Sequence, residues 1–142
     1  LFNDNKKEER YMKSVKYILD EKWQILLRKA KTDLSAATIL ATANSIHKET
    51  ILFHLEQAVE KLLKALLEKN NKSYAEVDDL MILKKFTQEW LNFDDEQISL
   101  LEELNNYRFE KYSENFELND VNDVNKYFDF VVEIERKVME ML

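Results

Sequence analysis

Apolar residues recur at intervals of three and four along most of the chain, the spacing that places side chains on one face of an α-helix. The first stripe starts after Asp20, a candidate N-cap, and its helix is predicted to end near Lys48. Its members are Trp23, Leu27, Ala30, Leu34, Ala37 and Ala41. A second helix is predicted from after Thr50 to Asn70 and Asn71, because asparagine tolerates the left-handed backbone that ends many helices. Its inward face comprises Ile51, Leu55, Ala58, Leu62 and Ala65.

Three further helices are predicted toward the C-terminus. One runs from about Ser73 to Trp90, with an inward face of Leu80, Leu83, Phe86 and Trp90. Another begins at Asp94, which forms a variant capping box with Gln97, and buries Ile98, Leu101, Leu104 and Tyr107. The last runs from about Asn119 and buries Val121, Val124, Phe128, Val131, Ile134, Val138 and Met141.

Together these segments predict an all-α protein. The links between them are short, which favours an antiparallel, up-and-down bundle of four to five helices over residues 20–142. Residues 1–19 form a predicted N-terminal extension, with a short helix expected in residues 5–18. Glycine, proline and cysteine are all absent, which argues against β-hairpins and excludes disulfides, thiol catalysis and glycine-rich phosphate loops.

Charge is unevenly distributed along the chain. The formal net charge is −7, yet residues 6–31 hold nine basic and four acidic side chains, whereas residues 94–123 hold two basic and ten acidic side chains. An acidic protein gains little attraction to a polyanion, so no binding to duplex DNA is expected. No uncharged run approaches the roughly 20 apolar residues of a membrane-spanning helix, and no signal peptide can be recognised. We therefore expect a cytoplasmic protein without membrane contact.

The second helix carries the main polar candidates. His47 and His54 lie seven residues apart with no carboxylate three or four residues away, so neither a metal site nor a cofactor is expected. Lys61 and Lys64 lie one turn apart, and Glu60 forms a favourable pair with Lys64. Two interpretations stay open: a solvated strip that orients the helix, or a ligand contact. The strip also includes Glu56 and Gln57.

Residues 53–67 resemble the second-helix signature of the HEPN domain. In that family an aromatic and a polar residue precede Gln-Ala, Glu-Lys and Lys-Ala on an apolar helix, and this chain has them in order from Phe53 to Ala65. The segment from Trp23 to Ala37 looks like the family's first helix. The segment from Leu104 to Tyr112 looks like the stretch that ends in Arg-Tyr. The resemblance covers about residues 20–142.

The resemblance implies a helical bundle that commonly forms dimers and partners minimal nucleotidyltransferases in toxin-antitoxin pairs. Many members are metal-independent ribonucleases with an Arg followed, after four to six residues, by a His. This chain departs from that motif, because the positions after Arg108 that should offer His are Ser113, Glu114 and Asn115. Lys111 replaces the usual Arg of Arg-Tyr. Relatives often carry His before Leu ahead of the third helix, where this chain has Asp78, Asp79 and Leu80.

The sequence therefore favours a non-catalytic binding or regulatory module: a homodimer that docks a nucleotidyltransferase or binds a nucleotide. Arg108, Lys111 and Tyr112 would form the contact cluster, since they offer cationic donors and a ring for stacking. In some relatives a nearby Tyr is nucleotidylated, which makes Tyr112 a candidate acceptor. A simpler interpretation pairs Arg108 and Lys111 with neighbouring glutamates of the fourth helix: Glu102, Glu103 or Glu114.

Two alternatives come from other functional classes. One is a ribonuclease with a degenerate motif that uses Tyr112 and His54, although a phenol with a pKa of about 10 is a poor base near neutral pH. The other is a structural bundle whose role is oligomerisation.

Overall fold

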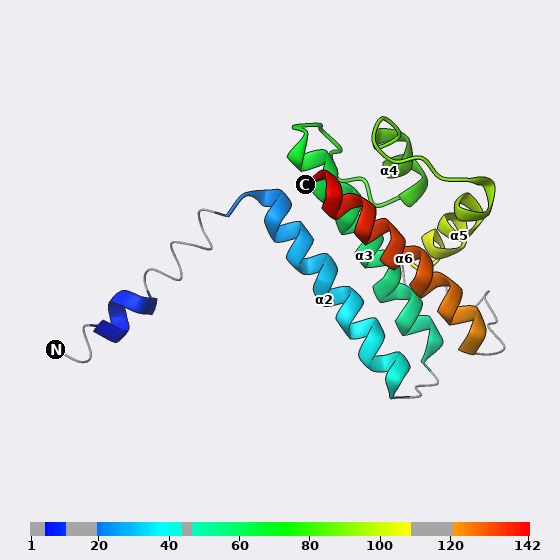
Figure 1. The fold of residues 1–142 in the computed structure, drawn as a ribbon, viewed down its shortest axis with the longest axis horizontal. Helices are drawn as coiled ribbons and strands as arrows, with labels where there is room; N and C mark the ends of the chain where they lie inside the picture. The colour runs from blue at the N-terminus through cyan, green and yellow to red at the C-terminus, as the bar shows by residue number, and fades with distance from the viewer. Residues whose placement is uncertain (1–4, 11–19, 44–46, 109–120) are drawn as a thin grey trace.

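The computed structural model describes residues 5–10, 20–43, 47–108 and 121–142 (Figure 1). Residues 5–10 are helical, and the remaining described residues form helices and the turns between them, without a strand. The helices are α2 (Lys22–Thr42), α3 (Lys48–Lys69), α4 (Leu80–Phe86), α5 (Asp95–Asn105) and α6 (Val121–Met141). The predicted all-α bundle is thereby confirmed, while the division at residue 20 stays a prediction.

Helix α3 occupies the centre of the bundle. α2 runs antiparallel to it, α6 runs in the same direction as α3, and α4 and α5 together take the place of a third long helix (Figure 1). All four other helices pack on α3, and α5 also packs on α4 and α6. The core consequently forms around α3, whose buried apolar residues are Ile51, Leu52, Leu55, Ala58, Val59, Leu62, Leu63, Ala65, Leu66 and Leu67.

Helix α2 follows the predicted stripe but has different ends. Ala30 and Ala37 are fully buried, and the other members of the stripe are half-buried. Alanines also line α3, so the two backbones can approach closely. Glu21 takes the N-cap position predicted for Asp20, and its backbone N–H donates to Gln24 Oε1 at 2.9 Å. Asp20 instead pairs with Arg28 at 2.7 Å. The helix ends at Thr42 rather than near Lys48.

Helix α3 begins at Lys48, three residues before the predicted start at Ile51, and ends where the asparagines predicted it. Asn71 has a left-handed backbone with φ 56°. Its N–H donates to the carbonyl of Glu68 at 3.1 Å, and the N–H of Lys72 donates to the carbonyl of Leu67 at 2.9 Å. This is the Schellman arrangement, in which asparagine takes the place of the absent glycine.

The prediction of a third helix from Ser73 to Trp90 is wrong in its length. α4 starts only at Leu80, because the Asp79 side chain caps it by accepting from the N–H of Met81 at 2.9 Å. Ala75 precedes it with a positive φ of 46°, which no α-helix accommodates. The chain turns again at Thr87, and Leu91 takes the buried position predicted for Phe86, which is 44% exposed.

The last two helices agree with their predicted faces. The Asp94 capping box is present, since its carboxylate accepts from the N–H of Gln97 at 2.8 Å while Gln97 Oε1 accepts from Asp94 N–H at 3.0 Å. Tyr107 is buried beyond the end of α5. On α6, Tyr127 donates its hydroxyl to Glu103 of α5, and Phe128 is half-buried. The predicted start at Asn119 lies outside the described residues. Buried positions on α6 are Val124, Tyr127, Phe130, Val131, Ile134 and Val138.

Within the described ranges, every helix is either too short or too polar to cross a membrane.

Candidate functional site

Two groups of paired polar side chains lie on different sides of α3. We call Asp33, His54 and Lys61 the Asp33 cluster, and Asp79, Asn105 and Arg108 the Arg108 cluster. An α-helix turns by about 100° per residue, so His54 and Glu56 point about 200° apart. His54 contacts α2, whereas Glu56 lies within the electrostatic range of Arg108. The two clusters are therefore separated by the body of α3.

The Asp33 cluster joins helix α2 to helix α3. Asp33, on α2, accepts from two residues of α3: His54 Nδ1 lies 3.0 Å from its Oδ1, and Lys61 Nζ bonds its Oδ2. All three side chains are half-buried, with exposed fractions of 27%, 24% and 13% for His54, Lys61 and Asp33. A single inward carboxylate thus fixes the register of α2 against α3.

A second set of hydrogen bonds runs along α3 and links Glu56, Gln57, Glu60 and Lys64; we call it the Gln57 chain. Gln57 Nε2 donates to Glu56 Oε2 at 2.8 Å and to Glu60 Oε2 at 3.1 Å. Lys64 Nζ donates to Glu60 Oε1 at 2.8 Å and lies 5.6 Å from the ring centroid of Tyr74. Glu56 is fully buried and Glu60 is 8% exposed, so the expectation of a solvated strip is wrong for these two glutamates. Helices α4, α5 and α6 also pack on α3, and periodicity within one helix cannot reveal which of its polar residues such packing buries.

Glu56 is the most perturbed carboxyl among the described residues. Burial raises its pKa to about 8; the hydrogen bond from Gln57 lowers it, the charges of Glu60 and Asp78 raise it, and the charge of Arg108 lowers it. Its Oε1 is buried and makes no hydrogen bond in the described part of the chain. A neutral carboxylic acid is the form that this environment favours at neutral pH.

The Arg108 cluster ties the end of α5 to the start of α4. Arg108 Nη1 lies 3.0 Å from Asp79 Oδ2 and donates to Asn105 Oδ1 at 3.4 Å. Asn105 Nδ2 donates to Asp79 Oδ1 at 3.0 Å, and its Oδ1 accepts from the N–H of Leu80 at 2.9 Å. Burial would raise the pKa of Asp79, but the N–H of Met81, with Arg108 and Asn105, holds it below its usual value. The guanidinium is therefore held in a defined position at the α4–α5 junction.

Of the predicted contact residues, only Arg108 falls within the described ranges, because Lys111 and Tyr112 lie outside them. Arg108 pairs with Asp79, a residue far away in sequence. Of the nearby glutamates considered above, Glu114 lies outside the described residues. The other four predicted candidates are divided between His54 and Lys61 in the Asp33 cluster and Glu60 and Lys64 in the Gln57 chain.

Sequence reasoning did not identify Asp33, Asp79 and Asn105 as partners. Asp33 carried the clearest signal, since it is a lone acid beside the apolar stripe of a helix that is otherwise basic. Its two partners, His54 and Lys61, are seven residues apart and share one face of α3.

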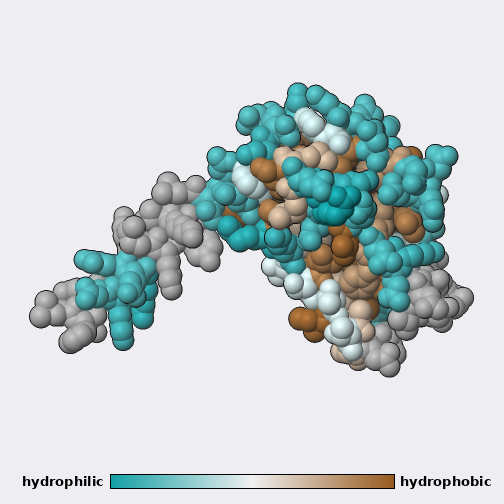
Figure 2. Space-filling model, viewed as in Figure 1, coloured by the Kyte–Doolittle hydropathy of each residue, from teal (hydrophilic) through white to brown (hydrophobic). Residues whose placement is uncertain are grey.

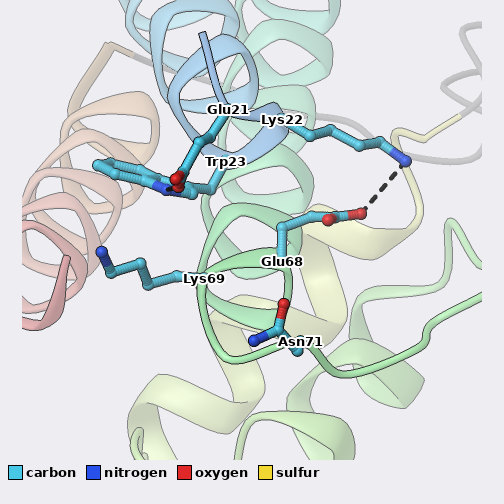
Figure 3. A pocket seen from close by; sticks show the side chains of 6 residues that line it. All are labelled: Glu21, Lys22, Trp23, Glu68, Lys69 and Asn71. Atoms are coloured by element: carbon cyan, nitrogen blue, oxygen red, sulfur yellow. Dashed lines mark hydrogen bonds and ion pairs between the residues drawn. The ribbon is translucent and has the colours of Figure 1, made fainter. Parts of the chain in front are cut away.

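A separate polar pocket of about 460 Å³ lies where the start of α2 meets the end of α3 (Figure 3). Figure 3 shows the indole of Trp23 beside the Glu21 carboxylate, with Lys69 reaching toward it. Lys69 Nζ lies 4.7 Å from the indole centroid, and Lys22 Nζ lies 3.2 Å from Glu68 Oε1. Two lysines thus face two glutamates, and the pocket has no surplus charge to attract an ionic ligand.

Among the described residues, no group of three or more histidine, aspartate or glutamate side chains is arranged to hold a metal ion.

Comparison with models of known protein families finds a match over most of the chain. The model of the HEPN domain matches residues 23–141. Among solved structures, the crystal structure of TT1696 from Thermus thermophilus is similar, with a TM-score of 0.70 and 17% sequence identity. The similarity covers 87% of this chain and 100% of that one. At this identity the likeness concerns the fold alone. No curated protein matches the chain.

Proposed function

Because this chain belongs to the HEPN domain family, we propose that it is a non-catalytic binding or regulatory module that works as a dimer and docks a minimal nucleotidyltransferase. The observation that carries this proposal is the position of His54. That imidazole is paired with Asp33 on the α2 side of α3, away from Arg108. The imidazole that serves as general acid or base in acid-base cleavage of RNA has to lie next to the cation, and His54 does not supply one there.

The sequence supports the same proposal. Positions 113 to 115, where the ribonucleases of the family offer histidine, are Ser, Glu and Asn. The arginine of that motif is present as Arg108, and its guanidinium is pre-organised by the contacts that it makes to the Asp79 and Asn105 oxygens. A pre-organised arginine recognises phosphate or carboxylate without a large ordering cost. With Lys111 and Tyr112 close in sequence, Arg108 is the residue we assign to contact a nucleotide or the partner's acidic surface.

Thermal unfolding in the presence of nucleotides tests the nucleotide part of the proposal. We expect the purified protein to gain stability with a nucleoside triphosphate and Arg108→Ala to abolish the gain, since a ligand that binds only the folded state stabilises it in proportion to its affinity. Arg136→Ala is the matched control, because Arg136 is exposed on α6 and pairs with Glu133 and Glu140. No gain with any common nucleotide would contradict nucleotide binding and leave docking of a protein partner.

An RNA cleavage assay separates this proposal from the ribonuclease alternative. We expect neither structured nor single-stranded RNA to be cleaved by a preparation free of contaminating nucleases. Cleavage that disappears with His54→Ala or Arg108→Ala would overturn the non-catalytic assignment.

Co-purification tests docking where a minimal nucleotidyltransferase is encoded next to this chain. Co-purification of the two proteins that is weakened by Arg108→Ala and not by Arg136→Ala would support docking. Transfer of a nucleotide to Tyr112 would be visible by mass spectrometry of the same complex.

A further inference from the structure

The guanidinium of Arg108 acts on a carboxyl that solvent does not reach. Glu56 is fully buried on α3, whereas the Arg108 side chain, just after α5, is 30% exposed. The positive charge of Arg108 favours the ionised form of Glu56. It is the one cation among the charged groups that act on this carboxyl in the described part of the chain. A change of charge at Arg108 therefore alters the balance between the neutral and the ionised form of Glu56.

Hydrogen bonding does little to stabilise a negative charge on Glu56. The amide nitrogen of Gln57 donates to Glu56 Oε2 at 2.8 Å and to Glu60 Oε2 at 3.1 Å, which uses both of its N–H groups. Glu56 Oε1 is buried and has no hydrogen-bond partner within the described ranges. A buried carboxylate is stable only when several donors or a cation compensate for the lost water. With a single donor, Glu56 depends on Arg108 for that compensation.

The other charged groups that act on Glu56 oppose its ionisation. Glu60 lies one turn along α3 and Asp78 lies just before α4, and both are like charges. Lys64 donates to Glu60 at 2.8 Å and offsets part of its charge. Within the described ranges, no charged group of α2 or α6 acts on Glu56, and Figure 2 shows apolar residues gathered over the region between these two helices. The charge balance at Glu56 is therefore set from α3 and from the α4–α5 side.

An anion bound at Arg108 would change this balance. It would place negative charge next to the guanidinium and cancel the attraction that Arg108 exerts on the Glu56 carboxylate. Salt screens this interaction less than one between exposed charges, because Glu56 is buried. Binding of the anion thus favours the neutral form of Glu56. Because coupling between two binding events is reciprocal, the neutral form of Glu56 must in turn favour binding of the anion.

We propose that Glu56 makes the binding of an oxyanion at Arg108 proton-linked: the anion binds more tightly while the Glu56 carboxyl holds its proton than after that proton has left. This inference rests on the proposed role of Arg108 in binding an anionic group. Without an anion the pKa of Glu56 is about 8, and the anion raises it further. Affinity is therefore greatest well below pH 8 and falls as the pH rises through 8, where binding takes up a proton from solvent.

Sulfate titrations of the full chain test the proposal, because sulfate, unlike phosphate, keeps its charge across this pH range. Binding is followed by the carbon NMR signal of the Arg108 guanidinium, with sodium chloride at equal ionic strength as the reference. We expect sulfate to bind roughly fivefold more weakly at about pH 9 than at about pH 6.5. Saturating sulfate should also shift the titration of the Glu56 carboxyl carbon to higher pH.

Three variants assign the effect to this pair of residues. Glu56→Gln places a neutral side chain of the same shape on α3, and its sulfate affinity should be the same at both pH values. Glu102→Gln is the matched control, because Glu102 is exposed on α5, and it should keep the wild-type difference. In Arg108→Ala, sulfate should no longer shift the Glu56 titration, which should itself lie at higher pH than in the wild type.

The failure of this inference can be told apart from that of the proposed function. Equal sulfate affinity of the wild type at the two pH values, or a Glu56→Gln variant that keeps the difference, would overturn the proton linkage and leave Arg108 as an anion contact. A Glu56 titration that Arg108→Ala leaves unchanged would also overturn it. Absence of sulfate binding at both pH values would overturn this inference together with the nucleotide part of the proposed function.

Discussion

Among the described carboxyls, Glu56 has the most strongly shifted pKa, and the main cause is the burial of its side chain. Its side chain is fully buried on α3, and only one of its oxygens has a hydrogen-bond partner within the described ranges. Glu60 and Asp78 add like charge, and Arg108 offsets part of it. A carboxyl in such a setting costs little while it is neutral and destabilises the fold when it ionises.

This gives a prediction for the pH dependence of stability. The pKa of Glu56 is about 8 in the folded chain against an ordinary value of 4.5, so the folded state binds the proton more tightly. Stability should therefore be highest below pH 4.5 as far as Glu56 is concerned, and should fall as the pH rises to 8, by roughly 3 to 5 kcal/mol. In urea unfolding across this range, Glu56→Gln should remove that fall while keeping a polar side chain.

Glu102→Gln is the control for that experiment, because Glu102 is exposed on α5. It should unfold with the same pH dependence as the wild type. Parallel curves for the wild type and Glu56→Gln would mean that Glu56 is not the group responsible.

At the scale of single elements, α4 is the helix whose existence depends most on tertiary partners. It has seven residues, too few to be stable by propensity. Asp79 caps its first turn, Asn105 of α5 accepts from the N–H of Leu80, and Leu80 and Leu83 are buried. The helix therefore forms because α5 is next to it, and its start orients Arg108 through Asp79.

Two substitutions at Asp79 separate the cap from the ion pair. Asp79→Asn keeps an N-cap acceptor and should cost less than about 1 kcal/mol, because the half-exposed pair with Arg108 contributes little. Asp79→Ala removes both and should cost about 1 to 2 kcal/mol in the free energy of unfolding measured in urea. Equal losses in the two variants would show that the charge, and not the cap, holds this junction.

At the scale of the whole molecule, the bundle is uneven in its packing. α3 is surrounded by the other helices and has twelve buried residues, whereas α2 packs on α3 alone and has two. Local opening is easiest where few buried contacts must be broken. The molecule is thus built from a well-packed centre with one long helix on its edge.

Hydrogen exchange should reveal this difference. Amides in the middle of α3, around Leu62, should exchange most slowly, and those of α2 should exchange faster. Equal protection of α2 and α3 would contradict the packing described here.

Several features of the chain could be predicted before any coordinates. The periods of three and four gave the inward faces of α2, α3, α5 and α6, because the period of a helix is a property of its own sequence. The capping box at Asp94 and the left-handed Asn71 were recognisable for the same reason, since they involve neighbours in the chain. The third helix was predicted too long because its start depends not only on the Asp79 cap but also on Asn105, more than twenty residues away, which accepts from the N–H of Leu80.

The sequence by itself thus determined that this protein is an all-α bundle of the HEPN family, which helix faces point inward, and that no histidine follows Arg108 at the spacing of the family's ribonucleases. Only the tertiary structure decided that Asp33 holds His54 and Lys61, that Glu56 is buried, that Arg108 pairs with Asp79, and that α2 and α6 both pack on α3 without contacting each other. The physical reason is how far apart in the sequence the interacting residues lie. Helix periodicity and caps arise from residues a few positions apart, whereas burial and pairing between helices depend on how all helices pack together.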